Sequence, residues 1–371
     1  MPPAASIADL LRIRQAHLNE LRRQPNYRGS AVGYKFLEHQ NAIARENDAS
    51  IPAVILFVEA KVPDLADNQR FDEGRNRQLT ITDSAGQSIS AATDVVASGY
   101  ADGIPWVPRL APAAEARRRA VVESHEISGG IPVRSPFLTG TAGCVIRYGP
   151  GRRQLALLTN AHVAGQPGLA IERPEPTVLP VGQTGRSHLL AAEASKAKAP
   201  LDAWMDSQAW LDAAAIDLDP AILPHVQPGV IGLGSIQPAD PPALESLDLL
   251  GELVISVGAT CGQRYGRIVG VGYEWAQDGS YYHADYLILG CDDSPQHNFN
   301  RVPFAAEGDS GKLVLLAKGL QPLGLLWGGH RLQFGSSMAS QEAWCLATDI
   351  SRVLSALDAE IVELPTSSTA A

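Results

Sequence analysis

The sequence lacks a long apolar run and an excess of basic residues. None of its segments reaches the roughly 18 uninterrupted apolar residues of a membrane helix, and its first 24 residues hold no apolar core of a signal peptide. The formal net charge of −10 disfavours nucleic acid and anionic membranes as partners, because both attract basic patches. We therefore expect a cytoplasmic protein whose partner is a protein, a peptide or a small molecule. The sequence leaves open whether the chain forms a homo-oligomer.

Cysteine is also scarce, with four residues in 371 and no CxxC pair. Free and mostly buried thiols are expected, which fits a reducing compartment. The stretch from His283 to His297 contains Cys291 and several acidic residues, but their spacing fits no closed zinc site, so we expect no metal. The four cysteines are Cys144, Cys261, Cys291 and Cys345.

The length of 371 residues exceeds the roughly 250–300 that one hydrophobic core usually serves, so more than one domain is expected. Residues 1–105 predict a small α+β domain. Ser6 and Asp9 form a capping-box pattern ahead of leucines at helical spacing, which predicts an amphipathic helix over 6–23. Apolar, β-branched runs then predict strands at 52–62, 78–83 and 94–96.

A proline- and arginine-rich stretch, 106–127, is expected to be a linker. From residue 128 onward, short apolar runs alternate with Gly, Pro and Asp, which predicts a mainly β sandwich or barrel. A helical pattern over 350–362 closes this domain, and the polar tail 363–371 is expected to be disordered.

A turn, Glu307–Gly311, precedes the apolar run KLVLLA and holds a serine between glycines. Gly308 and Gly311 permit backbone angles that a side chain would disfavour. Such a turn exposes the Ser310 hydroxyl and lets the N–H groups of Gly308 and Ser310 converge on one point, where an oxyanion can be held. Ser310 is therefore a candidate nucleophile, and a plain hairpin turn is the alternative.

His162 is the candidate base for this serine. It follows the apolar run LALLT, so it lies at the end of a predicted strand, where side chains face clefts. A structural or surface histidine is the alternative. Its pairing with a serine motif favours the catalytic interpretation.

Three carboxylates in the segment SQAWLDAAAIDLDP are candidates for orienting the histidine: Asp212, Asp217 and Asp219. Asp212 precedes four apolar residues, so its side chain lies where the chain enters the core. A buried carboxylate beside an imidazole holds the ring in one tautomer and stabilises its charged form. Asp217 is the second candidate because it alternates with Ile216 and Leu218, and all three can also be turn carboxylates.

The segments TNAHV, DAAAI and GDSG, in that order, resemble the signature segments of trypsin-like serine peptidases. The intervals, 50 residues from His162 to Asp212 and 98 from Asp212 to Ser310, look typical of that family. The resemblance covers about 128–360. It implies two antiparallel Greek-key β-barrels, about 128–235 and 245–350, with the active site between them.

Further segments carry the resemblance. The glycine-rich stretch 256–272 resembles the start of the second barrel in bacterial members. GLLWGG resembles the strand that pairs with the main chain of a substrate, and Leu326, Trp327 and Gly328 match its motif. GYK, PAVILFVEAKVP and TDVVASG resemble a branch that includes a plant leaf-shape regulator and bacterial relatives.

The resemblance implies a serine endopeptidase that needs no cofactor and acts on a protein or peptide, with a regulatory or processing role. Phe304, six residues before the candidate nucleophile, falls where the family often places the base of the specificity pocket. An apolar residue there favours neutral substrate side chains, and a core position is the alternative for Phe304. A catalytically silent barrel that serves as a binding or scaffold module is the competing hypothesis.

Overall fold

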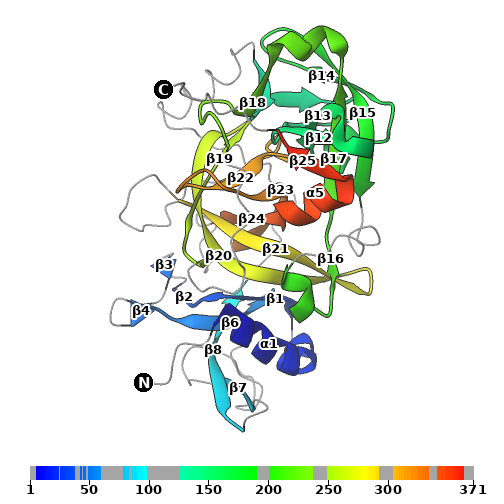
Figure 1. The fold of residues 1–371 in the computed structure, drawn as a ribbon. Coiled ribbons are helices and arrows are strands. Elements are labelled where there is room, and N and C mark those ends of the chain that lie inside the picture. Colours follow the sequence, from blue (N-terminus) through cyan, green and yellow to red (C-terminus); the bar gives the residue numbers. More distant parts are fainter. Residues whose placement is uncertain are drawn as a thin grey trace, which may run out of the picture.

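Two β-sheets, of eleven and eight strands, contain most of the strands in the computed structural model (Figure 1). The mainly β fold predicted from the sequence is confirmed. The structure describes residues 6–24, 26–37, 42–43, 45–46, 49–59, 78–82, 86–97, 126–189, 200–236, 249–291, 304–333 and 341–362.

The first helix, α1 (Ile7–Arg22), begins with the capping box that the sequence predicts. The Ser6 hydroxyl accepts a hydrogen bond from the N–H of Asp9, and the Asp9 carboxylate accepts one from the N–H of Ser6, both at 3.1 Å. The predicted amphipathic helix is confirmed. Its buried face consists of Ile7, Leu10, Leu11, Ile13, Arg14, Leu18 and Leu21.

The N-terminal strands extend the larger sheet instead of forming a sheet of their own. β1 (Tyr27–Tyr34) pairs with β6 (Pro52–Val58) on one side and with β20 (Gly262–Gln277) on the other. β8 (Ser88–Ala97) pairs with β6 and with β7 (Gln78–Thr82), which forms the edge. β6, β7 and β8 lie at the predicted positions. Two short pairs are β2 (Phe36–Leu37) with β3 (Ala42–Ile43) and β4 (Arg45–Glu46) with β5 (Ala49–Ser50).

The eight-stranded sheet closes into the first barrel, in the order β11-β10-β14-β15-β17-β13-β12-β25. A one-turn helix, α3 (Ala161–Ala164), follows β13, and β9 (Ile127–Gly129) pairs in parallel with β18 (Val226–Val230). The strands of the barrel are β10 (Pro132–Arg134), β11 (Thr139–Thr141), β12 (Val145–Tyr148), β13 (Gln154–Thr159), β14 (Ala170–Arg173), β15 (Leu179–Leu189), β17 (Asp212–Leu218) and β25 (Ala359–Ile361).

The larger sheet curls into a half-barrel that carries the second half of the chain. β20 pairs with β21 and with β19, while β16 (Gln208–Ala209) joins the outer edge of β21 although it precedes β17 in the sequence. In Figure 1 this half-barrel lies between the green first barrel and the blue N-terminal elements. Its other strands are β19 (Leu253–Gly258), β21 (Ser280–Cys291), β22 (Leu313–Leu316), β23 (Pro322–Gln333) and β24 (Gln341–Asp349).

The apolar cores cross the predicted domain boundaries. One buried cluster contains Ile7 and Val54 from the N-terminal elements together with Ile268 and Leu323 from the larger sheet. A domain normally has its own core, whereas the described N-terminal elements share a core and a sheet with the second barrel. The division at residue 105 stays a prediction. In the predicted linker 106–127, the stretch up to residue 125 lies outside the described residues, and so does the tail 363–371.

The C-terminal helix is shorter than predicted. α5 (Ile350–Leu357) ends before the expected residue 362 because Asp358 adopts left-handed backbone angles, with φ 51° and ψ 54°. The chain then forms β25, which pairs with β12 of the first barrel. A second apolar cluster joins both barrels to this helix through residues such as Leu158, Leu315 and Val353.

Candidate active site

His162 lies on a one-turn helix at the end of β13. The apolar strand ends at Thr159, and Gly165, with φ +74°, ends the turn of helix. Asn160 is fully buried at the start of the turn, and its Nδ2 donates a hydrogen bond to the main-chain oxygen of Asp212 at 2.6 Å. The turn therefore places the His162 side chain, 30% exposed, at the border of the barrel.

Asp212 holds the imidazole at two points. One carboxylate oxygen lies 2.5 Å from His162 Nδ1, and the other accepts the backbone N–H of His162 at 3.1 Å. Asp212 is only 4% exposed. When Nδ1–H faces a carboxylate, Nε2 is left as the proton acceptor, which suits a general base.

Asp217 and Asp219 lie elsewhere. Asp217 accepts a hydrogen bond from the Tyr148 hydroxyl, and burial together with Asp217 raises the pKa of Tyr148 above its ordinary value. An odd spacing along β17 puts Asp217 on the opposite face of the strand from Asp212. Asp219 accepts the N–H of Ala221 at a helix start. Of the three candidates, only Asp212 contacts His162.

The turn that carries Ser310 packs tightly against the first barrel. The N–H of Thr141 donates to the Ser310 main-chain oxygen at 2.8 Å. Gly311 has φ +95°, and a Cβ there would lie 2.4 Å from Thr141 O and from Thr159 Oγ1, and 3.1 Å from the nitrogen of Asn160. Asn160 is two residues before His162, so the two predicted motifs are brought together in space.

The buried side chain of Asp309 fixes the shape of this turn. Its fully buried carboxylate accepts the N–H groups of Thr260 at 2.8 Å, Cys261 at 3.1 Å and Ala306 at 3.1 Å. Lys312, also fully buried, lies 3.7 Å away and balances the charge.

Gly308 lies in the left-handed region, with φ +93°. Within the described part of the chain, neither its N–H nor that of Ser310 has an acceptor, so both donors are available to a ligand. The Ser310 hydroxyl likewise makes no hydrogen bond with a described residue. A hydrogen bond between a catalytic base and its nucleophile often tightens only when substrate is bound.

Beside Ser310, one edge of β23 has no pairing strand among the described residues. Leu326, buried in the core, accepts the N–H of Gly311 at 2.8 Å and donates to Lys312 O at 3.1 Å. Beyond Leu326, β24 is the strand that pairs with β23 among the described residues. Trp327 is half-buried, and a Cβ on Gly328 would meet nothing within 4 Å. An extended peptide has room to pair here.

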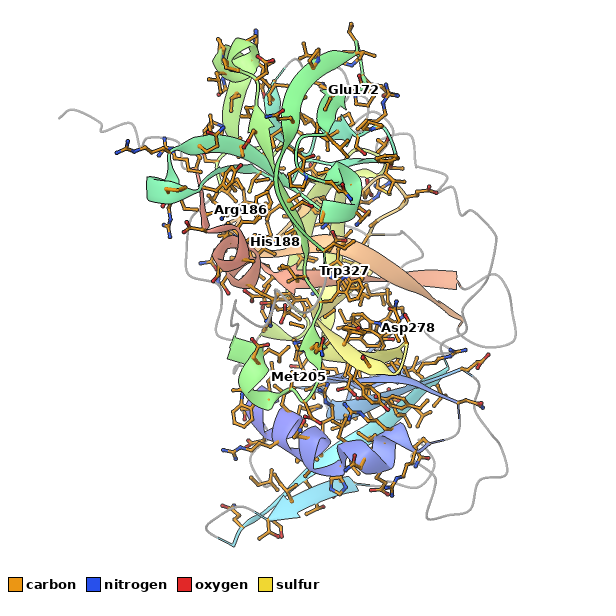
Figure 2. The ribbon with its side chains drawn as sticks, turned by 90° about the vertical axis from the view of Figure 1, so that its right-hand side faces the viewer. Glu172, Arg186, His188, Met205, Asp278 and Trp327 are labelled. Atoms are coloured by element: carbon orange, nitrogen blue, oxygen red, sulfur yellow. The ribbon has the colours of Figure 1, made fainter. Side chains whose placement is uncertain are left out.

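Trp327, labelled in Figure 2, belongs to an aromatic cluster that the sequence did not indicate. Its ring centroid lies 5.6 Å from that of Trp210 and 5.7 Å from that of Trp275. Trp210 in turn contacts Tyr282 edge-on at 5.3 Å. These residues come from four separate segments, so no local pattern could have revealed the cluster.

Phe304 is fully buried in the core. The centroid of its ring lies 4.2 Å from Lys312 Nζ, and its main-chain oxygen accepts a hydrogen bond from the same Nζ. The structure therefore supports the core interpretation of Phe304 over the base of a specificity pocket.

The residues considered for metal binding have other partners. His283 Nδ1 lies 3.1 Å from Ser207 Oγ, and Asp285 accepts from Arg352. Asp292, Asp293 and His297 lie outside the described residues. In the described ranges, no group of three or more His, Cys, Asp or Glu side chains is placed to hold a metal, no helix is long and apolar enough to cross a membrane, and the four cysteines are free and buried.

A first barrel that carries a His–Asp pair, set against a Gly-Asp-Ser-Gly turn of a second β-sheet, defines the trypsin-like fold class, as the sequence predicted. Residues 120–366 match the family model described as the Nal1 C-terminal domain. This match spans more than half of the chain, which therefore belongs to that family.

The protein NARROW LEAF 1 of Oryza sativa subsp. japonica is 27% identical over 384 residues, which cover 97% of this chain. The chain spans 61% of the length of that relative. This similarity confirms the branch that the N-terminal segments suggested.

Solved bacterial peptidases are similar at a lower level. Thermobifida fusca protease A is 20% identical with a TM-score of 0.41, and Cellulomonas bogoriensis chymotrypsin is 16% identical with a TM-score of 0.40. Each match covers 64% of this chain and 100% of the other.

Proposed function

We propose that the chain is a serine endopeptidase with Ser310 as nucleophile, His162 as general base and Asp212 as the orienting carboxylate. The observation that carries the proposal is the double contact between His162 and Asp212 beside a turn with two available N–H donors. A purely structural histidine does not require a buried carboxylate on Nδ1 together with a neighbouring serine turn.

The proposed reaction is acyl transfer. As Ser310 Oγ attacks the peptide carbonyl carbon, His162 takes its proton, and the N–H groups of Gly308 and Ser310 hold the oxyanion. Collapse of the tetrahedral intermediate expels the amine, which receives the proton from His162. Water then attacks the acyl ester while His162 accepts its proton, and the regenerated Ser310 hydroxyl takes that proton back.

The edge of β23 that has no pairing strand among the described residues supports an extended peptide as substrate. Trp327 and its neighbour Trp210 offer a large aromatic surface beside this edge, which suits apolar substrate side chains. We propose a protein substrate in the cytoplasm, cut at one or a few sites in a regulatory or processing reaction.

A fluorophosphonate probe tests the proposal directly. The wild-type protein should react covalently and Ser310→Ala should not, because the probe labels only an activated serine. If wild type and variant both stay unlabelled, the alternative of a silent barrel that binds partners replaces the enzyme. Peptide products from a cell lysate treated with wild type or Ser310→Ala then separate processing, with one or two sites, from degradation, with many.

A further inference from the structure

The segment that leads into Asp212 rests on the N-terminal helix. This segment consists of a 3-10 helix, Pro200–Trp204, then Met205–Ser207, β16, Trp210 and Leu211. In Figure 1, β16 lies near α1 and β1, away from the first barrel, and Figure 2 places Met205 directly beside α1. Although the sequence assigns these residues to the first barrel, their support comes from the opposite end of the molecule.

Three arginines of α1 contact this segment. Arg14 Nη2 donates to Met205 Sδ at 2.8 Å, the Arg12 guanidinium lies 5.4 Å above the Trp204 ring, and Arg22 lies 3.7 Å from Asp206. Leu201 is fully buried in the same apolar cluster as the buried face of α1. Because apolar packing and the contacts of charged arginines act on the same segment, they fix it in one position.

Buried charges also hold α1 on the larger sheet. Arg22 binds the fully buried Glu274 of β20 through two hydrogen bonds, at 3.1 and 2.9 Å. Arg14 is fully buried and donates to the main-chain oxygen of Gly272, and burial lowers its pKa while Glu274 opposes this shift. A buried charge that loses its partner is costly, so α1 has little freedom to shift.

The other end of the segment is equally constrained. The N–H of Trp210 donates to His283 O at 2.8 Å, and Thr348 Oγ1 donates to Trp210 O at 2.8 Å. At the first end of the segment, Asp202 also binds Arg352 of α5 through hydrogen bonds at 2.9 and 2.7 Å. Two residues after Trp210, the carboxylate of Asp212 meets His162. A continuous series of contacts therefore runs from α1 to the candidate active site.

We propose that α1 is a positioning element for the active site, with Arg14 as its main positioning residue. By holding the 200–211 segment, the helix sets the position of Asp212 and, through it, of the His162 ring. The effect on catalysis rests on the proposed function, whereas the effect on the segment does not. Misplacing a catalytic group by 1 Å can cost about 10²-fold in rate, so a loosened segment has a measurable consequence.

Arg14→Met tests this role, because methionine keeps an apolar side chain of similar length but removes the donors to Met205 and Gly272. Arg23→Met is the matched control, since Arg23 is exposed at the end of the same helix. Met205→Ala cuts the contact from the other side and leaves the hydrogen bond of Arg14 to Gly272 intact, so it serves if Arg14→Met fails to fold.

Two measurements are made on each variant. Hydrogen exchange of the peptide spanning 207–216 reports the order of the segment whether or not the protein is an enzyme. The rate of labelling by a fluorophosphonate, with kcat and KM on a cleaved peptide, reports the site. We expect faster exchange and a fall of about tenfold to hundredfold in labelling and kcat for Arg14→Met, with a smaller change in KM. Arg23→Met should match wild type.

Unchanged exchange in Arg14→Met and Met205→Ala would overturn the proposal. So would faster exchange with unchanged labelling, because the segment would then not determine the site. A loss of labelling without faster exchange would place the effect elsewhere and overturn it as well. If wild type itself is unlabelled, the proposed enzyme function fails, and the role of α1 in catalysis fails with it, whereas exchange still decides its role in ordering the segment.

Discussion

The carboxylate of Asp212 accepts both the ring Nδ1–H and the backbone N–H of His162, at 2.5 and 3.1 Å. The backbone contact fixes where the histidine sits, and the ring contact fixes how the imidazole is turned. Because one buried carboxylate makes both contacts, the position and the tautomer of the ring depend on the same residue.

Replacing Asp212 with asparagine should therefore lower kcat by about 10³–10⁴-fold, because the amide group favours the wrong tautomer of His162. Peptide cleavage under saturating substrate measures this change. Asp217→Asn is the matched control on the same strand, and since Asp217 contacts Tyr148 it should keep nearly full activity. Equal losses in the two variants would contradict the assignment of the carboxylate.

The parts of this site that the sequence could predict are those encoded locally. The capping box of Ser6 and Asp9, the apolar strand before His162 and the glycines around Ser310 each lie within a few residues of one another. The choice between Asp212 and Asp217 could not be made from local sequence. Both residues fit a strand, and they differ only in the face of β17 on which the side chain lies. That face is decided by pairing with β13 and β15, which the sequence does not display.

Contacts between distant segments account for the differences between the sequence predictions and the structure. β1 joins β20 across more than 200 residues, so an N-terminal unit that looked separate shares a core with the second barrel. Phe304 has the right spacing for a specificity pocket, but its ring is fully buried in the core against the Lys312 ammonium. Such outcomes follow from packing, and spacing along the chain does not reveal them.

Gly311→Ala should destabilise the protein by about 2–5 kcal/mol, because its Cβ would approach two oxygens of the first barrel and its backbone angle is left-handed. Gly319→Ala isolates the backbone part of this cost. Gly319 has φ +83° with open space around the Cβ position, so about 1–2 kcal/mol is expected. Urea unfolding of both variants measures the difference, and similar losses would show that the barrels do not approach as closely as described.

Stability should also depend on Asp349, whose pKa is raised above its ordinary 3.8 by burial and by the neighbouring Asp285. The folded state then binds this proton more tightly than the unfolded state does. The stabilising contribution is complete below pH 3.8 and is lost as the pH rises through the folded-state pKa.

Asp349→Asn removes this dependence while it keeps an acceptor for the N–H of Ser351 at the start of α5. The unfolding free energy of wild type relative to this variant should therefore fall as the pH rises above 3.8. Denaturant titrations between pH 4 and 8 measure the trend. The exposed Asp278, labelled in Figure 2, supplies the matched variant Asp278→Asn, which makes the same substitution at the surface. A difference that rises with pH would contradict the direction of the shift.

Thr141 should be important to catalysis, although it is far in the sequence from Ser310. Its hydroxyl donates to Gly308 O at 2.9 Å and accepts the N–H of Ala259 at 3.0 Å, so it ties the first barrel to the turn that would hold the oxyanion. Thr141→Val keeps the shape of the side chain but leaves the buried N–H of Ala259 without its acceptor, which costs about 1–3 kcal/mol, and removes the donor to the half-buried Gly308 O. Because the Gly308 peptide is then less firmly oriented, kcat should fall more than KM rises. Thr141→Ser retains the hydroxyl and should recover most of the turnover. If it lost as much turnover as Thr141→Val, the two hydrogen bonds of the hydroxyl alone would not account for the loss, which would contradict this assignment.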